Sequence, residues 1–208
     1  MSDFSTILIT QNDMTDNELK AFIDELKENS VKELFVLPSY LSRAKTLLEG
    51  SGIMLGSFVD YPLAAGTIAK IAFETGELFR MGADILQVSL SIVDVKRRDW
   101  AHLEKVKNTV TPLAYGSSEL RFSIETANLK EIDKIHLARV VNHLEIPSIA
   151  IDTVDTESAM HDATIFRMDG GNDLFIQVNI QNGTNDDIEL IFENGASQVG
   201  RIVKAVEN

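Results

Sequence analysis

The sequence predicts an α/β protein folded as a compact (β/α)8 TIM barrel, and three observations carry that prediction. Short strand-like runs alternate with longer amphipathic, helix-like runs along the 208 residues. Such alternation predicts parallel strands joined by right-handed crossovers. The strand-like runs are eight in number, which favours a closed barrel over an open, doubly wound sheet. No glycine-rich dinucleotide fingerprint follows the first run, which also counts against the open sheet.

The expected strands are short apolar or alternating runs of residues. They are Ile7–Thr10, Glu33–Pro38, Met54–Val59, Ile85–Ile92, Leu120–Thr126, Ser148–Thr153, Leu174–Ile180 and Ser197–Gly200. Because this length suits one compact barrel with short loops, we expect residues 1–208 to form a single domain.

The expected helices carry apolar residues at the spacing of a buried helix face. The first begins at a capping box formed by Thr15 and Glu18. Others are expected over Thr67–Arg80, from near Asp99, over Leu129–Leu144 and from near Asn185. Two helix ends place a glycine, Gly82 or Gly195, where a left-handed cap is needed, and a strand follows at once.

Charge and composition narrow the classes of partner. There are 32 acidic and 19 basic residues, a net charge of −13. A field of this sign repels phosphodiester backbones and anionic lipid, so we expect neither nucleic acid nor a membrane as partner. The absence of cysteine excludes a disulfide or a thiol nucleophile. No run approaches the roughly 20 apolar residues of a membrane span and no basic leader is evident, so a cytoplasmic location is expected.

Polar side chains recur on one face of four successive expected strands. Since side chains alternate along a strand, this face points into the barrel if the other face packs under helices. Buried polar groups are costly unless they are paired. A self-satisfied network, reversed faces and a small-molecule pocket at the carboxyl ends of the strands all stay open. The polar rows are Gln87, Ser89 and Ser91; Arg121, Ser123 and Glu125; Ala150 and Asp152; and Gln177, Asn179 and Gln181.

The candidate catalytic residues lie near the carboxyl ends of these strands. Glu125 and Asp152 are on neighbouring strands and would share acid and base roles if their environments separated their pKa values. For Arg121 the plainer interpretation is a structural ion pair with Glu125 inside the barrel. The expected substrate-binding residues are Asp60, Gln87, Ser91, Arg121, Asn179 and Gln181.

Lys96 is the third candidate catalytic residue, as a relocated amine nucleophile beyond the fourth strand. A solvated surface lysine is the plainer alternative, because a nucleophilic amine has to be desolvated. We expect no cofactor and no metal centre, since the four histidines show no ligand-like spacing. An oxygen-only Mg²⁺ site from Asp60, Glu125 and Asp152 stays open as an alternative.

Several segments of the chain resemble the deoxyribose-phosphate aldolase family. Residues Asp60–Ile68 are similar to the family's Gly-Phe-Pro-Leu-Gly-Ala-Thr-Thr-Thr. The other similar segments are Gly82–Ile92, Lys96 with Asp99 and Trp100, Leu120–Thr126 and Asn194–Gly200. The resemblance implies a TIM barrel and a class I aldol reaction, and because barrels of this family commonly pair, it is compatible with a homodimer.

The resemblance also implies a catalytic trio, which this sequence does not reproduce. In the family a lysine on the sixth strand forms a Schiff base, a lysine on the seventh lowers its pKa, and an aspartate on the fourth assists proton transfer. The corresponding residues here are Ala150 or Ile151, Gln177 or Asn179, and Gln87. Since this mechanism cannot omit its amine, we do not expect the ordinary cleavage reaction.

Two hypotheses of function follow from this combination. The first is an enzyme with altered chemistry, such as a lyase or isomerase acting on a small carbonyl or sugar-phosphate-type compound. The second is a catalytically inactive relative that binds a metabolite or a protein partner. Replacing Glu125 would abolish turnover under the first hypothesis and would change only binding under the second.

Overall fold

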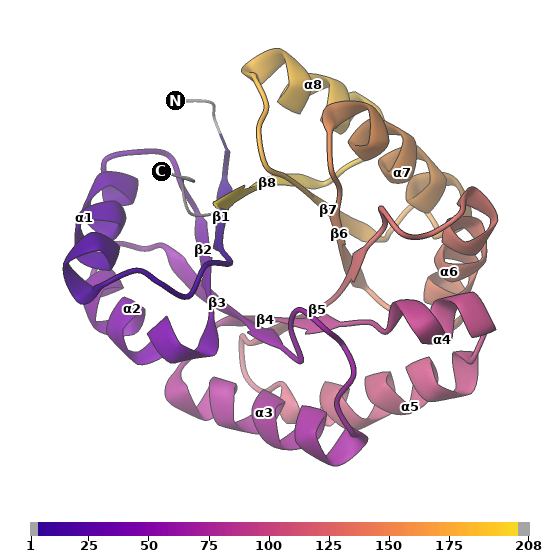
Figure 1. The fold of residues 1–208 in the computed structure, drawn as a ribbon, viewed down its shortest axis with the longest axis horizontal. Helices are drawn as coiled ribbons and strands as arrows, with labels where there is room; N and C mark the ends of the chain where they lie inside the picture. The colour runs from indigo at the N-terminus through magenta and orange to yellow at the C-terminus, as the bar shows by residue number, and fades with distance from the viewer. Residues whose placement is uncertain (1–3, 204–208) are drawn as a thin grey trace.

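The computed structural model describes residues 4–203, which form a closed barrel of eight parallel strands in sequential order. Strand β1 pairs with β8 and closes the ring. Figure 1 looks down this barrel, with the helices arranged around its outside. The predicted fold class is therefore confirmed. Residues 1–3 and 204–208 of the expected domain lie outside the described residues.

The strands follow the eight expected runs closely. Their bounds are β1 (Thr6–Ile9), β2 (Glu33–Val36), β3 (Met54–Val59), β4 (Ile85–Ser89), β5 (Glu119–Glu125), β6 (Ser148–Asp152), β7 (Phe175–Ile180) and β8 (Gln198–Val203). The largest differences are that β4 stops at Ser89 instead of Ile92 and that β8 continues to Val203 instead of Gly200; β2 also ends at Val36 instead of Pro38. Strand β4 ends early because Ser91 is an N-cap, whose hydroxyl accepts a hydrogen bond from the Asp94 amide at 3.2 Å.

The helices connect the strands on the outside of the barrel. Their bounds are α1 (Asp16–Lys27), α2 (Leu41–Leu48), α3 (Ile68–Met81), α4 (Ile92–Arg97), α5 (Trp100–Val110), α6 (Glu131–His143), α7 (Thr156–Asp169) and α8 (Asn185–Glu193). The predicted capping box at Thr15 is present. Gly82 and Gly195 both have the expected left-handed backbone, with φ of 98° and 102°. The sequence did not single out α2, α4 or α7.

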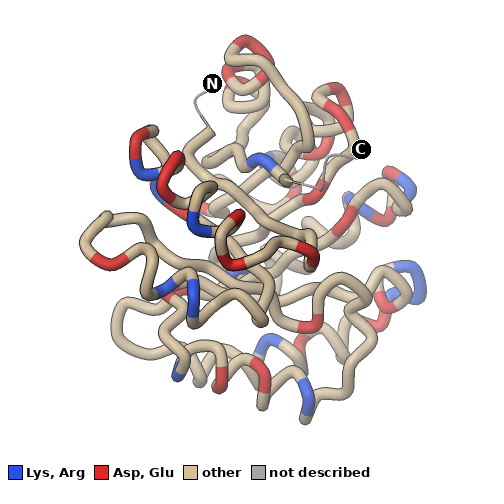
Figure 2. The backbone as a smooth tube through the Cα atoms, turned by 60° about the vertical axis from the view of Figure 1, so that its left-hand side comes forward, with Lys and Arg blue, Asp and Glu red and all other residues tan. Residues whose placement is uncertain are grey.

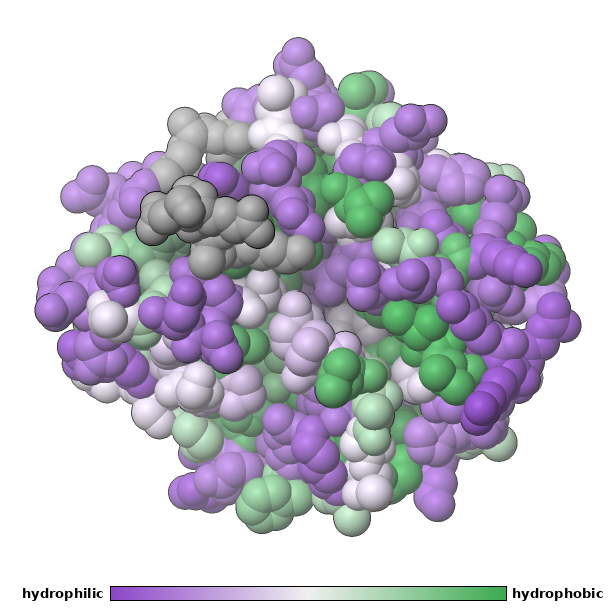
Figure 3. All heavy atoms as spheres, in the orientation of Figure 1, coloured by the Kyte–Doolittle hydropathy of each residue, from purple (hydrophilic) through white to green (hydrophobic). Residues whose placement is uncertain are grey.

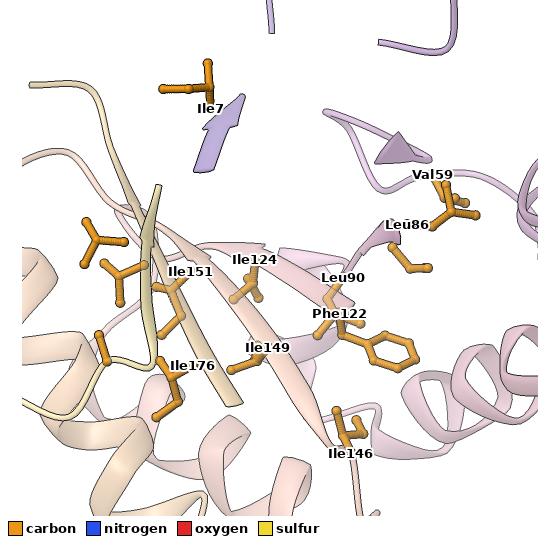
Figure 4. Packing of buried hydrophobic residues seen from close by; sticks show 14 of the residues in the cluster. Ile7, Val59, Leu86, Leu90, Phe122, Ile124, Ile146, Ile149, Ile151 and Ile176 are labelled. Atoms are coloured by element: carbon orange, nitrogen blue, oxygen red, sulfur yellow. The ribbon is translucent and has the colours of Figure 1, made fainter. Parts of the chain in front are cut away.

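The main hydrophobic core lies between the strands and the helices. The outward-facing residues of the strands, such as Phe122, Ile149 and Ile151, pack beneath the surrounding helices (Figure 4). Removing apolar surface from water stabilises such a layer by roughly 25 cal/mol per Å². This layer holds the barrel together and leaves the inward faces of the strands free for other chemistry.

The inside of the barrel has two chemically different halves. The apolar half consists of Leu8, Phe35, Phe58 and Ile85, from β1 to β4, and is separate from the main core. The polar half consists of Gln87, Arg121, Gln177 and Asn179, from β4, β5 and β7, all at most 3% exposed. Gln87 and Gln177 bond across the barrel at 3.2 Å. The prediction that this polar face points inward is therefore confirmed.

The surface carries charges of both signs on its helices and loops (Figure 2). The face seen in Figure 3, in the orientation of Figure 1, mixes hydrophilic and hydrophobic side chains. Within residues 4–203, no helix is long and apolar enough to cross a membrane.

Candidate functional site

A cavity of about 170 Å³ lies at the carboxyl ends of the strands. Its polar lining includes Tyr61, Ser89, Ser123, Glu125, Asp152 and Gln181. Active sites of TIM barrels lie at this end, because loops from several strands converge there. Pockets for drug-sized ligands span roughly 300–1,000 Å³, so this cavity suits a small compound.

Glu125 and Asp152 come together in the cavity, as their strand positions predicted. They are direct partners in the pairing of β5 with β6. Neighbouring strands are about 4.8 Å apart, so the two carboxylates lie side by side at the cavity wall. Glu125 is exposed and Asp152 is half-buried. The amide Nδ2 of Asn179 donates to Oδ1 of Asp152 at 2.8 Å, which fixes one carboxylate of the pair.

A directed chain of hydrogen bonds links Asp152 to the barrel interior. Arg121 Nη1 donates to Gln177 Oε1 at 2.7 Å, and Gln177 Nε2 donates to Asn179 Oδ1 at 2.7 Å. Each amide accepts on one side and donates on the other, so the chain has one direction, from guanidinium to carboxylate. The amide of Asn179 therefore presents its N–H to Asp152 because Arg121 orients Gln177.

Arg121 itself lies near the amino end of the barrel and is not among the residues that line the cavity, so its predicted role in substrate binding stays a prediction. Its guanidinium bonds both oxygens of Glu33, at 2.7 and 2.8 Å, and also contacts Glu119 at 3.0 Å. The expected pairing with Glu125 is therefore wrong, because Arg121 lies four residues earlier in β5 and reaches across to β2. Burial lowers the pKa of Arg121, but hydrogen bonds and attraction to Glu33 and Glu119 outweigh it and raise the pKa above its ordinary value.

Tyr61 is a cavity residue that the sequence reasoning missed. It follows the end of β3, and its ring stacks on Phe58 with centroids 4.8 Å apart. Burial and the charges of Asp152 and Glu125 raise the pKa of the phenol, while a hydrogen bond with the Thr10 side chain opposes the shift. The raised pKa favours the protonated phenol, which can donate a hydrogen bond. The one signal was a tyrosine where the aligned family pattern has phenylalanine.

Asp60 does not join Glu125 and Asp152 in the cavity. Its Oδ1 accepts from Lys70 Nζ at 2.6 Å, and its Oδ2 accepts from the Gly66 amide at 2.7 Å. The hydrogen bond to Asp60 raises the pKa of Lys70. The set of three oxygen donors considered for Mg²⁺ is therefore not assembled. Within residues 4–203, no group of three or more His, Cys, Asp or Glu side chains is placed to hold a metal ion.

The other predicted site residues lie at different depths. Gln181 lines the cavity just beyond β7, whereas Gln87 is buried below it and bonds to Gln177. Ser91 caps α4 and lies with Asp60 in a smaller recess beside the cavity. Lys96 is exposed on α4 and is not among the residues that line the cavity. The functional roles assigned to these residues stay predictions.

The residues discussed in place of the family's catalytic trio lie inside the barrel, except Ile151, which faces outward into the main core. Ala150 is buried on β6, on the same face as Asp152. Gln177 and Asn179 project from β7 and Gln87 from β4, and all three take part in the polar half. Amide side chains thus occupy the interior around Ala150.

Comparison with known proteins connects this barrel to one group of enzymes. No protein-family model matches the chain. A deoxyribose-phosphate aldolase from Clostridioides difficile (strain 630) is 28% identical over 195 residues, covering 92% of this chain and 88% of that protein. One from Acholeplasma laidlawii (strain PG-8A) is 25% identical over 189 residues, covering 90% and 85%.

A solved structure agrees with these sequence matches. The deoxyribose phosphate aldolase from Aeropyrum pernix, described as tetrameric, matches with a TM-score of 0.77 and 15% identity, over 95% of this chain and 83% of that chain. The resemblance predicted from the sequence motifs is therefore confirmed: the chain is similar in sequence to deoxyribose-phosphate aldolases over about nine-tenths of its length and has the same barrel fold.

Proposed function

We propose that this protein is an aldolase-like lyase that acts on a small carbonyl compound through carboxylate acid–base catalysis, without a Schiff base. The observation that carries the proposal is the pair of Glu125 and Asp152 at the cavity, with Asp152 held by Asn179. The similarity to deoxyribose-phosphate aldolases supports the reaction class. The side chains around the cavity support a different catalytic mechanism for that reaction, because the described residues that line it include two carboxylates and no lysine.

Asp152 is the proposed base of a retro-aldol step. Its carboxylate takes the proton from the substrate hydroxyl, and the bond from the hydroxyl-bearing carbon to the α-carbon breaks. The electron pair of that bond moves through the α-carbon onto the carbonyl oxygen, giving an aldehyde and an enolate. The Tyr61 phenol, whose raised pKa keeps its proton in place, donates a hydrogen bond to the enolate oxygen.

Glu125 completes the proposed cycle. Its exposed carboxyl exchanges protons with water and delivers one to the α-carbon of the enolate, while Asp152 returns its proton to solvent. Two carbonyl products leave and the enzyme regains its starting protonation. The two neighbouring carboxylates thus need different roles, and their different exposure supports that division.

We further propose the setting in which the protein works. Residues 1–208 form one domain that acts in the cytoplasm without a resident cofactor and without nucleic acid or membrane as a partner. We also propose that it assembles as a homodimer, and the oligomeric assembly of the Aeropyrum pernix aldolase supports self-association.

A catalytically inactive relative that binds a metabolite or a protein partner is the second candidate. Ala150 favours it: the inward-facing residues of β6, where the resemblance would put the amine, are Ser148, Ala150 and Asp152. An aldolase that lost its amine without gaining another catalyst would keep the cavity and lose turnover.

Turnover of a panel of β-hydroxy aldehydes and ketones tests the proposal. We expect Asp152→Asn to lower kcat by about 10²–10⁴-fold, the usual contribution of a general base. Asp155→Asn is the matched control, because Asp155 is an exposed N-cap of α7 and asparagine caps helices equally well. Equal activity of Asp152→Asn and wild type would refute the mechanism. Binding without turnover by the wild type would select the inactive relative.

A further inference from the structure

We infer that the ligand of this cavity is uncharged, so that the substrate is a non-phosphorylated polyhydroxy aldehyde or ketone. This inference rests on the proposed function, because it concerns the ligand of the same site. Three features carry it: the charge of the cavity lining, the acidic start of α8 and the hydroxyl groups on the cavity floor.

The charged residues that line the cavity within the described chain are both acidic. They are Glu125 and Asp152, and the other polar lining groups are hydroxyls and amides such as Tyr61, Thr153 and Gln181. Two like charges about 10 Å apart at an effective dielectric constant of about 20 repel enough to change affinity by about tenfold. A phosphate dianion beside two carboxylates is therefore disfavoured, whereas a neutral ligand is not.

Part of the region where barrels frequently hold phosphate is acidic here. That region includes the loop after the seventh strand, which in this protein leads into α8. In this protein Thr184 and Asp187 form a capping box at the start of α8, and Asp187 Oδ2 accepts from the Thr184 amide at 2.8 Å. Asp186 adds a second carboxylate. A phosphate would have to approach these two carboxylates to reach the backbone amides at the start of α8.

Arg201 does not offset this acidity inside the cavity. It alternates along β8 with Ile202, which lines the cavity, so Arg201 points to the other face of the strand. There it lines a separate open recess together with Asp187. Arg201 thus lies on the outer face of the strand and not in the cavity.

The floor of the cavity suits hydroxyl groups. Ser89 and Ser123 are direct partners in the pairing of β4 with β5. The Oγ of Ser89 is enclosed and has no hydrogen-bond partner among the described residues. A hydroxyl or carbonyl oxygen of a ligand would satisfy it, and the carboxylates above would accept from further hydroxyls.

Matched pairs of ligands test the inference on the whole protein. Calorimetry would compare glyceraldehyde, erythrose and 2-deoxyribose with the phosphate ester of each. We expect at least one free sugar to bind about tenfold more tightly than its ester. The ester should bind more tightly as salt rises, because salt screens the repulsion. Glu125→Gln should narrow the gap between sugar and ester, while Glu189→Gln, an exposed change on α8, should leave it unchanged.

The outcomes separate this inference from the proposed function. An ester that binds as tightly as its free sugar, or whose affinity falls as salt rises, would overturn the inference and leave the carboxylate mechanism standing. If no sugar or ester binds and none is turned over, the proposed function fails and the inference fails with it.

Discussion

The two halves of the barrel interior are stabilised by different kinds of interaction. The apolar half, Leu8, Phe35, Phe58 and Ile85, is held by packing. The polar half is held by hydrogen bonds that lead from a buried ion pair to Asp152. Hydrophobic packing has no direction and tolerates changes of similar volume, whereas a buried polar chain is stable only when every member is paired.

Because of this difference, the proposed catalytic groups lie beside the polar half of the barrel interior. The apolar half supports the cavity through Phe58, on which the Tyr61 ring stacks. The polar half orients the amide that holds Asp152. Tyr61 and the two carboxylates therefore meet where the halves meet. Disturbing either half should change stability, but the polar half should respond more sharply.

The largest expected effect comes from breaking the buried ion pair. Arg121→Met leaves Glu33, which is 4% exposed, without its cation. Losing one partner of a buried pair costs about 3–5 kcal/mol in the free energy of unfolding. Urea denaturation measures this loss. Adding Glu33→Gln should recover a large part of it, and a double variant no more stable than Arg121→Met would contradict the pairing.

Interrupting the chain of amide hydrogen bonds should lower the free energy of unfolding somewhat less than breaking the ion pair. Gln177→Leu removes the acceptor of Arg121 and Gln87 and the donor to Asn179. Leaving buried polar groups unpaired at this site should cost about 3 kcal/mol in all. Gln177→Glu is a useful companion, because it still accepts from Arg121 but offers no N–H to Asn179. A Gln177→Leu protein as stable as the wild type would show that the chain is not tightly coupled.

The apolar half should give a smaller response, of the kind caused by overpacking. A Cβ added at Gly56 would collide with the ring of Phe35. Gly56→Ala should therefore cost about 2 kcal/mol, within the usual range for an overfilled core. Phe35→Leu in the same chain makes room, so the double variant should be more stable than the sum of the single effects. Simple additivity in the denaturation data would contradict direct contact.

The smallest expected effect is on the ionisation of Tyr61. Its pKa is raised, so the unfolded chain loses this proton at a lower pH than the folded chain. The stability from the neutral phenol is present below the ordinary tyrosine pKa of about 10 and is lost as pH rises through the raised value. Phenolate absorbance, with Tyr61→Phe for assignment, measures it. Asp152→Asn should lower the pKa of Tyr61, because it removes a nearby negative charge. An unchanged Tyr61 titration in this variant would contradict the electrostatic interaction between Tyr61 and Asp152.

Most of the fold could be predicted from the sequence because local patterns determine it. Helix α7 was not predicted because its buried face includes a charged residue, which interrupts the apolar stripe. That residue is Asp162, which is 0% exposed and pairs with Lys134 at 2.6 Å. Strand β4 was predicted too long because the alternation of polar and apolar residues continues through Ser91, which is a helix cap. In both places a side-chain partner decides the structure, and periodicity does not identify partners.

The candidate site was predictable only in part, for the same reason. Strand alternation and order brought Glu125 and Asp152 together, because neighbouring parallel strands align their ends. The alternation of side chains along a strand does not identify the partner of Arg121, which is Glu33, 88 residues away in the chain, and not Glu125. It also could not place Tyr61, which lies in a loop, or show that Asp60 is bound by Lys70.

Borohydride trapping with intact-mass detection tests most directly whether carbonyl chemistry here proceeds without a Schiff base. The folded protein would be incubated with deoxyribose 5-phosphate, acetaldehyde and a panel of small aldehydes and ketones. The carboxylate mechanism predicts no stoichiometric adduct with any of them, although the same preparation turns over its substrate. A covalent adduct mapped to one lysine, with Lys96 the first to be checked, would contradict it and show a relocated amine nucleophile.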